Sequence, residues 1–266
     1  MIGLPFGRNK CYDIEIISKG WSQVEAVNKK FKNYQKELQE IKAKLATLPE
    51  GALRKKQGTY FQAIGRKLIG ITKKPAVIKQ LARKKYLLAR KIQIENLFSQ
   101  KPGEYDLLLP QELIATLPPV YRELPITYFH HPHTADWIAK VVVQNSLYLE
   151  NAKYHYNGVD FRSMSERIIA EQLTEYGLPY RYDSMLNLTQ QSISPDFVVK
   201  NPFNGHTVIW EHFGAFNTEK YADSMNDKID AILKQGFVEG VDLIVTFQYH
   251  LRNPARIQKL IRAVIF

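Results

Sequence analysis

Cysteine is nearly absent from this sequence, and no long apolar run interrupts its 266 residues. The one cysteine, Cys11, excludes an internal disulfide and a cysteine-based zinc site, which fits a reducing compartment. No window is apolar enough for a membrane-spanning helix, and the first residues lack the apolar core of an export signal. These absences predict a cytoplasmic protein with no membrane partner.

Acidic residues are scarce in one part of the chain only. Residues 1–102 hold 23 Lys and Arg against 7 Asp and Glu, whereas residues 103–266 hold 14 against 19. The net charge is therefore +16 in the first segment and −5 in the second. Such asymmetry is typical of a protein whose basic part holds a polyanion, and we expect nucleic acid. A solvated basic helical face and an acidic membrane surface are the alternatives.

A three-four apolar repeat marks residues 22–47 as a coiled-coil segment. The repeat consists of Val24, Val27, Phe31, Tyr34, Leu38, Ile41 and Leu45. Three heptads cannot hold an isolated helix, so the repeat needs a partner helix in the same chain or in a second copy. Residues 75–98 supply an intrachain candidate for an antiparallel hairpin, and a homodimer through residues 22–47 is the alternative.

The segment between these two helices predicts small antiparallel strands, because short apolar runs alternate with Gly58 and Gly65. Its basic and aromatic side chains suit phosphate contacts and base stacking. The predicted nucleic-acid-binding residues are Arg54, Lys55, Lys56, Tyr60, Arg66, Lys67, Lys73 and Lys74. The alternative is a solvated hairpin whose aromatic residues only pack on the helices.

Three segments are expected along the chain. Residues 1–102 predict a basic helical hairpin with a small β-hairpin insert, and residues 103–158 a connector with a helix from about Thr134 to Leu149. In residues 159–266 the expected elements are a helix at 163–177, strands near 180–188, 194–200 and 207–213, a helix at 219–235, a strand at 241–248 and a helix at 255–264. This order predicts an α/β fold, a mixed sheet flanked by helices.

Two carboxylates lie in apolar strand sequences on either side of the turn signal Asn204-Gly205, which predicts an antiparallel hairpin. Asp196 stands in Ser-Pro-Asp-Phe-Val-Val, and Glu211 stands in Val-Ile-Trp-Glu-His-Phe-Gly. A carboxylate removed from water is unfavourable unless it is paired or bound to a metal, and two close together repel each other. The pair therefore predicts a site for a divalent cation, Mg²⁺ or Mn²⁺.

These residues resemble the PD-(D/E)XK nuclease superfamily, whose restriction-endonuclease-like core is a helix, a three-stranded antiparallel meander, a helix and a strand. Asp196 after a proline matches the first half of the motif, and Glu211 matches the second. Glu166 stands where many members carry a glutamate on the first core helix. Phe213 occupies the position of the motif lysine, but some branches place that lysine on the following helix, where this chain has Lys228.

The phrases Trp-Glu-His-Phe-Gly at 210–214 and Leu-Pro-Glu-Gly at 48–51 are similar to one such branch of uncharacterised bacterial proteins, which also begin with a coiled-coil segment. The resemblance implies an endonuclease that depends on Mg²⁺ or Mn²⁺ and hydrolyses phosphodiester bonds, of DNA rather than RNA. Bacterial defence or DNA processing is the context that the resemblance suggests.

The resemblance also implies roles for individual residues. Asp196, Glu211 and the His212 backbone carbonyl would hold the ion, with Glu166 ligating directly or through water. Lys228 would orient or deprotonate the attacking water. The His212 side chain is expected on the strand face opposite Glu211.

Structural alternatives stand beside these roles. Ser163 and Glu166 form a capping-box pattern at a helix start, which alone would explain the glutamate. Ser163 and Tyr221 are possible substrate contacts, but Tyr221 also suits simple packing, and a helix lysine such as Lys228 is usually solvated. The missing motif lysine also permits a catalytically inactive nuclease fold that only binds nucleic acid or acts as a scaffold.

Overall fold

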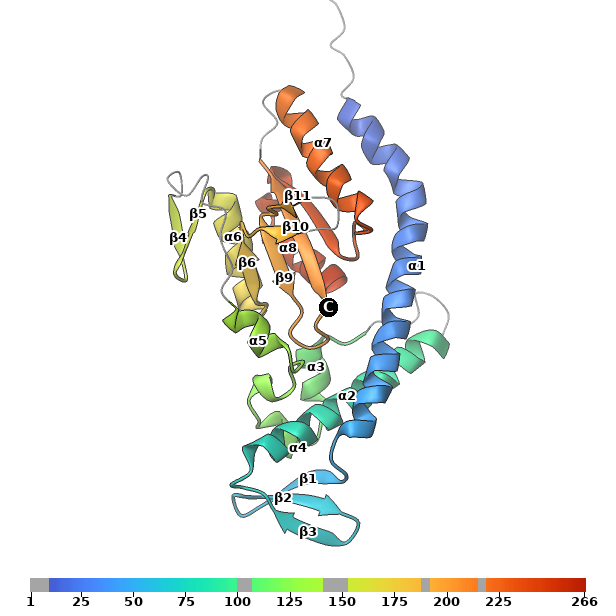
Figure 1. Ribbon diagram of the computed structural model, residues 1–266, viewed down its shortest axis with the longest axis vertical. Helices are drawn as coiled ribbons and strands as arrows, with labels where there is room; N and C mark the ends of the chain where they lie inside the picture. The colour runs from blue at the N-terminus through green and yellow to red at the C-terminus, as the bar shows by residue number, and fades with distance from the viewer. Residues whose placement is uncertain (1–9, 100–106, 141–152, 188–191, 215–218) are drawn as a thin grey trace, which may run out of the picture.

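The computed structural model describes residues 10–99, 107–140, 153–187, 192–214 and 219–266, with the backbone alone for 10–23 and 219–222. It is a mixed α/β structure, as the sequence predicts. Helix α1 (Lys10–Thr47) runs along one side of the molecule, with a small sheet at its lower end and a larger sheet beside its upper half (Figure 1). Among the described residues, no helix is long and apolar enough to cross a membrane.

The basic N-terminal part consists of two helices with a sheet between them. Helix α1 leads through β1 (Ala52–Lys56), β2 (Thr59–Ile64) and β3 (Lys67–Gly70) to α2 (Pro75–Ser99). The strands pair antiparallel in the order β1-β2-β3. The predicted strands are confirmed, but the insert is a three-stranded meander and not a single hairpin. The chain reverses twice, at turns where Gly58 and Gly65 have positive φ.

Helix α2 is the partner of the apolar repeat in α1. The rings of Phe31 and Phe98 lie 5.1 Å apart, and Arg90 pairs with Glu37 at 2.8 Å, so the helices run antiparallel as predicted. The repeat residues packed in this core are Tyr34, Leu38, Ile41 and Leu45. Those left exposed are Val24, Val27 and Phe31. The second half of the repeat therefore packs within the chain. Only the first half remains exposed for a homodimer contact with a second copy.

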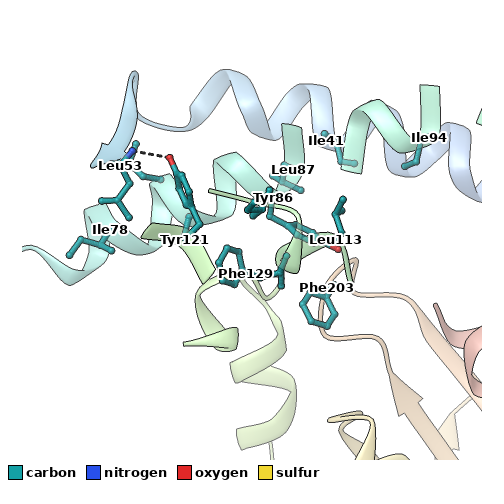
Figure 2. Close-up of a cluster of buried hydrophobic side chains, with 14 of the residues drawn as sticks. Ile41, Leu53, Ile78, Tyr86, Leu87, Ile94, Leu113, Tyr121, Phe129 and Phe203 are labelled. Carbon is teal, nitrogen blue, oxygen red and sulfur yellow. Dashed lines mark hydrogen bonds between the residues drawn. The ribbon is translucent and has the colours of Figure 1, made fainter. Parts of the chain in front are cut away.

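The connector forms short helices, and α3 and α4 start at prolines, which suit the first helical turn. They are α3 (Pro110–Ala115), α4 (Pro119–Arg122), the 3-10 turn η1 (Ile126–Tyr128) and α5 (Thr134–Ala139). The backbone N–H of Leu53 in β1 donates to the hydroxyl of Tyr121 at 2.8 Å, which fixes the small sheet to the connector (Figure 2). The prediction of one helix from Thr134 to Leu149 is wrong at its end, because Lys140 has an extended backbone; residues 141–152 lie outside the described residues.

The C-terminal part contains the larger sheet. Its elements are β4 (Tyr154–Tyr156), β5 (Val159–Phe161), α6 (Met164–Glu175), β6 (Tyr180–Tyr182), β7 (Leu186–Asn187), β8 (Ser192–Ile193), β9 (Phe197–Lys200), β10 (Thr207–Phe213), α7 (Glu219–Lys234), β11 (Leu243–Phe247), the 3-10 helix η3 (Gln248–Arg252), α8 (Pro254–Leu260) and the π-helical turn η4 (Ile261–Ile265). The strand order is β11-β10-β9-β6, antiparallel except for the parallel pair of β10 and β11.

The predicted order of helices and strands in this part is confirmed, including the antiparallel pairing of β9 with β10. The hairpin of β4 and β5 was not predicted. The strand expected near 180–188 is divided into β6 and β7, because Asp183 takes a positive φ and interrupts it. Strand β7 pairs with β8 in a separate two-stranded ribbon.

Alternate residues of β10 face different helices, as the period of a strand requires. Trp210 packs with Ile169 of α6 and Ile257 of α8, whereas Ile209 packs with Ile232 of α7. Helices α6 and α8 therefore cover one face of the sheet, and α7 covers the other. A side chain that shares the face of Ile209 lies under α7.

Arg83 of α2 joins the N-terminal part to the loop between β9 and β10. Its guanidinium donates hydrogen bonds to the backbone oxygens of Phe203, at 2.7 Å, and Phe129. The side chain is buried, and burial lowers the pKa of Arg83 to about 10. A second link comes from α1, where Lys29 pairs with Asp242 at 2.6 Å. These contacts fix α1 and α2 against the larger sheet.

Candidate functional site

Asp196 and Glu211 are brought together at one end of the β9–β10 pair. Phe197 is the register partner of Trp210, so Asp196 and Glu211 follow as the next opposed positions on the sheet face under α7. Both side chains are buried, and Glu211 is 0% exposed. The pairing of two strands that the sequence separates by a turn therefore creates the acidic pair that the sequence predicts.

Lys228 reaches this acidic pair from α7. Its Nζ donates to Glu211 Oε2 at 2.7 Å, and its charge also acts on Asp196. Phe213, two residues after Glu211 on β10, is buried against Phe247 with ring centroids 6.0 Å apart. An ammonium from α7 is thus present beside the carboxylates, and the neighbouring strand position is apolar.

Glu166 forms the capping box that the sequence suggests. Its Oε2 accepts from the Ser163 backbone N–H at 2.7 Å, and the Ser163 hydroxyl accepts from the Glu166 N–H at 3.1 Å. The Tyr182 hydroxyl also donates to Glu166 Oε2, at 3.1 Å. Ser163 therefore acts as a helix cap, and the carboxylate of Glu166 is already held by several donors.

Arg162 links Glu166 to the acidic pair, and sequence reasoning missed it. Its Nη2 lies 3.1 Å from Asp196 Oδ1 and 3.4 Å from Glu166 Oε1, and its Nη1 lies 3.8 Å from Asp183 Oδ2. The four-residue spacing of Arg162 and Glu166 at a helix start was a signal for a local pair. Nothing in the sequence indicated that the same guanidinium would contact Asp196.

Burial dominates the electrostatics of the three carboxyl groups. Burial, followed by repulsion from Asp196, raises the pKa of Glu211 to about 8 despite the nearby Lys228. Burial also raises the pKa values of Asp196 and Glu166. Within the described residues, Glu211 Oε1 is a buried oxygen with no hydrogen-bond partner. Such an oxygen is strongly unfavourable when charged, unless a cation or a proton reaches it.

The backbone and the side chain of His212 contact different partners. Its backbone N–H donates to Asp196 Oδ2 at 2.7 Å, which orients that carboxylate. Its ring lies on the opposite face, where Nδ1 is 3.0 Å from Thr246 Oγ1. Burial lowers the pKa of His212 to about 4, so the ring is neutral at physiological pH. The ring is placed as a structural group and not beside the acidic pair.

The carboxylate oxygens of the site have the chemistry that a hard divalent cation requires, but their arrangement does not form a complete coordination site. Carboxylate oxygens are the ligands that Mg²⁺ and Mn²⁺ prefer, and the buried Glu211 Oε1 has no hydrogen-bond partner among the described residues. In the part of the chain that the structure describes, however, no group of three His, Cys, Asp or Glu side chains is placed to hold a metal ion. Arg162 and the helix cap already hold the Glu166 carboxylate. Asp196 and Glu211 are therefore the two carboxylates that remain as candidate ligands of a metal ion.

The predicted nucleic-acid-binding residues lie elsewhere. Arg54 and Lys56 are exposed on the face of the small sheet opposite the buried Leu53, whereas Lys55 pairs with Glu123 at 2.6 Å. The other exposed basic residues of the set are Arg66, Lys67, Lys73 and Lys74, and Tyr60 is half-buried. Figure 1 places this sheet at the far end of the molecule from β10 and α7.

The basic set therefore forms a surface separate from the acidic pair. Tyr221 lies on α7, but its side chain is outside the described part of the structure.

Comparison with known proteins gives little further information. No family model matches the chain, and no solved structure matches it. An uncharacterised protein of Methanocaldococcus jannaschii is 31% identical over 97 residues. The similar region is 36% of this chain and 8% of that protein, so the chain spans a small fraction of its relative. This similarity brings no activity, substrate or partner with it.

Proposed function

We propose that this protein is a metal-dependent endonuclease that hydrolyses phosphodiester bonds of nucleic acid, DNA rather than RNA. The observation that carries the proposal is the contact of Lys228 Nζ with Glu211 Oε2 at 2.7 Å, on the face where Asp196 lies opposite Glu211. A lysine beside two buried carboxylates at adjacent strand positions is the combination that the PD-(D/E)XK resemblance requires. Here the lysine comes from the helix and not from the strand.

The order of elements supports the same proposal. Helix α6, the antiparallel strands β6, β9 and β10, helix α7 and the parallel strand β11 follow one another as in the superfamily core. The ribbon of β7 and β8 is an addition between the first two strands of that meander. The fold thus supports a restriction-endonuclease-like core, to which the connector and the basic N-terminal part are attached.

The residues of the site suit phosphodiester hydrolysis. Asp196 and Glu211 would hold Mg²⁺ or Mn²⁺, and a bound divalent ion would polarise the phosphate and lower the pKa of a bound water. Lys228 carries a positive charge toward the developing charge on phosphorus-bound oxygens and orients the attacking water. The His212 N–H and Arg162 hold Asp196 in place. Burial keeps these interactions strong by excluding bulk water.

A catalytically inactive nuclease fold is the second candidate, and Arg162 favours it. This guanidinium lies between Glu166 and Asp196 and compensates part of their charge without a metal. Phe213 fills the motif position with an apolar ring. In this candidate the protein binds nucleic acid through its basic surface and cuts nothing.

Cleavage of supercoiled plasmid tests the proposal. Wild type is compared with Asp196→Asn and Glu211→Gln in Mg²⁺, Mn²⁺ and EDTA, and Asp227→Asn, an exposed carboxylate of α7, is the matched control. We expect nicking that needs a divalent ion, with the two site variants at least ~10²-fold slower and the control unchanged. Wild type that stays silent on supercoiled, nicked, branched and single-stranded DNA and on RNA overturns the proposal and leaves the inactive fold.

A further inference from the structure

A row of aromatic rings starts beside the acidic pair. Phe213 follows Glu211 by two residues on β10, so the two side chains share the sheet face under α7. Phe247 is the register partner of Phe213 on β11, and their ring centroids lie 6.0 Å apart. Because β10 and β11 are parallel, both strands end at this edge of the sheet. The aromatic row therefore begins at Phe213, next to the acidic pair on the same face of the sheet.

The row continues to the protein surface through η3. The ring of Tyr249 stacks on that of Phe247, with centroids 5.9 Å apart and planes 10° apart. The ring of His250 lies 4.0 Å from that of Tyr249. Phe213 is 6% exposed, whereas Tyr249 is 44% exposed. The buried end of the row thus lies at the acidic pair, and its outer end is partly exposed to solvent.

The chain segment that begins with η3 and carries Tyr249 is basic. Residues 248–266 contain Arg252, Arg256, Lys259 and Arg262 and no Asp or Glu. Arg256 Nη1 donates to the backbone oxygen of Tyr249 at 3.3 Å, so this cation lies beside the backbone of Tyr249. Arg252 and Arg256 are exposed, whereas Arg262 is paired with Glu112 at 2.8 Å. A phosphate chain that passes Tyr249 would therefore meet a basic segment with two exposed arginines.

We propose that Tyr249 is a stacking platform for an unpaired base of the strand that is cut, so that the substrate is single-stranded nucleic acid or a single-stranded end. This inference rests on the proposed function and names its substrate class. A base in a duplex already stacks on its neighbours and offers no free face, whereas an unpaired base stacks on an aromatic ring. Exposed arginines of the same segment provide the phosphate contacts that such a strand needs.

Binding without cleavage tests this inference separately from the activity. Short single-stranded DNA and RNA oligonucleotides, each with a fluorescent 2-aminopurine at successive positions, are titrated with protein in EDTA. Stacking quenches this fluorophore. The variants are Tyr249→Ala and Tyr249→Phe, which keeps the ring, and Ile126→Ala is the control because Ile126 is a comparably exposed apolar residue, at 42%.

For wild type we expect quenching that is strongest at one position and weaker binding of a matched duplex. Tyr249→Ala should lose the position-specific quenching and bind the single strand about tenfold more weakly or worse, while Tyr249→Phe and Ile126→Ala retain both. The DNA and RNA series show which strand is preferred. Equal binding by Tyr249→Ala, or preferred binding of the duplex, overturns the inference.

The two proposals fail in different ways. If cleavage depends on the carboxylates but Tyr249→Ala has no effect, the stacking proposal is rejected and the nuclease proposal stands. If quenching depends on the Tyr249 ring but the protein cleaves no substrate, the stacking proposal stands and the catalytically inactive fold is supported.

Discussion

Lys228 Nζ on α7 lies 2.7 Å from Glu211 Oε2 on β10, although the two residues are 17 positions apart. The Glu211 side chain is 1% exposed and that of Lys228 is 30% exposed. The carboxylate therefore depends on the ammonium for compensation, while the ammonium itself remains accessible from solvent. This asymmetry allows the lysine to contact both the buried acidic pair and a ligand that enters from outside.

Replacement of Lys228 tests the catalytic role that the proposed function gives to this lysine. We expect Lys228→Met to cleave about 10²-fold more slowly or worse, because the positive charge beside the reacting phosphate is removed. Single-turnover cleavage at saturating protein measures the rate. Lys234→Met, which removes an exposed lysine in the last turn of the same helix, is the matched control. Full activity of Lys228→Met would assign the lysine to charge compensation alone.

The raised pKa of Glu211 predicts a pH-dependent stability. The pKa is about 8 in the folded protein against 4.5 for an ordinary glutamate, so the folded state holds this proton more tightly. Stability from this group is therefore greatest at low pH and falls as the pH rises toward 8, by up to about 1.4 kcal/mol per pH unit. Urea unfolding in EDTA at several pH values between about 5 and 8 measures this slope.

The control for this pH dependence is Glu211→Gln, which cannot ionise. Its unfolding free energy should decline less over the same pH range, and near pH 8 it should match or exceed that of wild type. A group whose pKa does not depend on Glu211, such as His212, is common to both proteins and cancels in the difference. Identical slopes for the two proteins would contradict the raised pKa of Glu211.

Loss of Arg83 should destabilise the protein. Arg83→Met leaves the backbone oxygens of Phe129 and Phe203 without their buried donor, at a cost of roughly 2 kcal/mol. The urea midpoint, followed by far-ultraviolet circular dichroism, should fall accordingly. Lys79→Met changes an exposed cation on the same helix and should leave the midpoint unchanged. A midpoint equal to that of wild type for Arg83→Met would show that the two carbonyls find other partners.

Neutralising the small sheet should weaken nucleic-acid binding and its salt dependence together. Arg54→Gln with Lys56→Gln removes two exposed charges from one face, and the slope of log affinity against log salt should fall in magnitude by about 1 for each phosphate that the variant no longer binds. Fluorescence anisotropy with labelled DNA measures both quantities. Lys32→Gln with Lys36→Gln, two exposed residues of α1, is the control. An unchanged slope would identify the sheet as a solvated basic surface.

Local patterns in the sequence determined the elements of this protein. The three-four repeat from Val24 to Leu45 predicted α1, and the Gly58 and Gly65 turns predicted the small strands, because periodicity and turn chemistry act between near neighbours. Apolar runs on either side of Asn204-Gly205 predicted the pairing of β9 and β10, and with it the approach of Asp196 to Glu211. These predictions depend on interactions within a few residues or across one turn.

Only the tertiary structure decided which distant groups meet. Packing of α7 on the sheet face of Ile209 brings Lys228 to Glu211, and the segment that leads into α6 brings Arg162 to Asp196 at the end of β9. The sequence predicted that α2 would partner α1, but it did not show that Arg83 would bind the β9–β10 loop. Such contacts depend on how helices pack on a sheet, and the spacing of residues along one element does not encode that geometry.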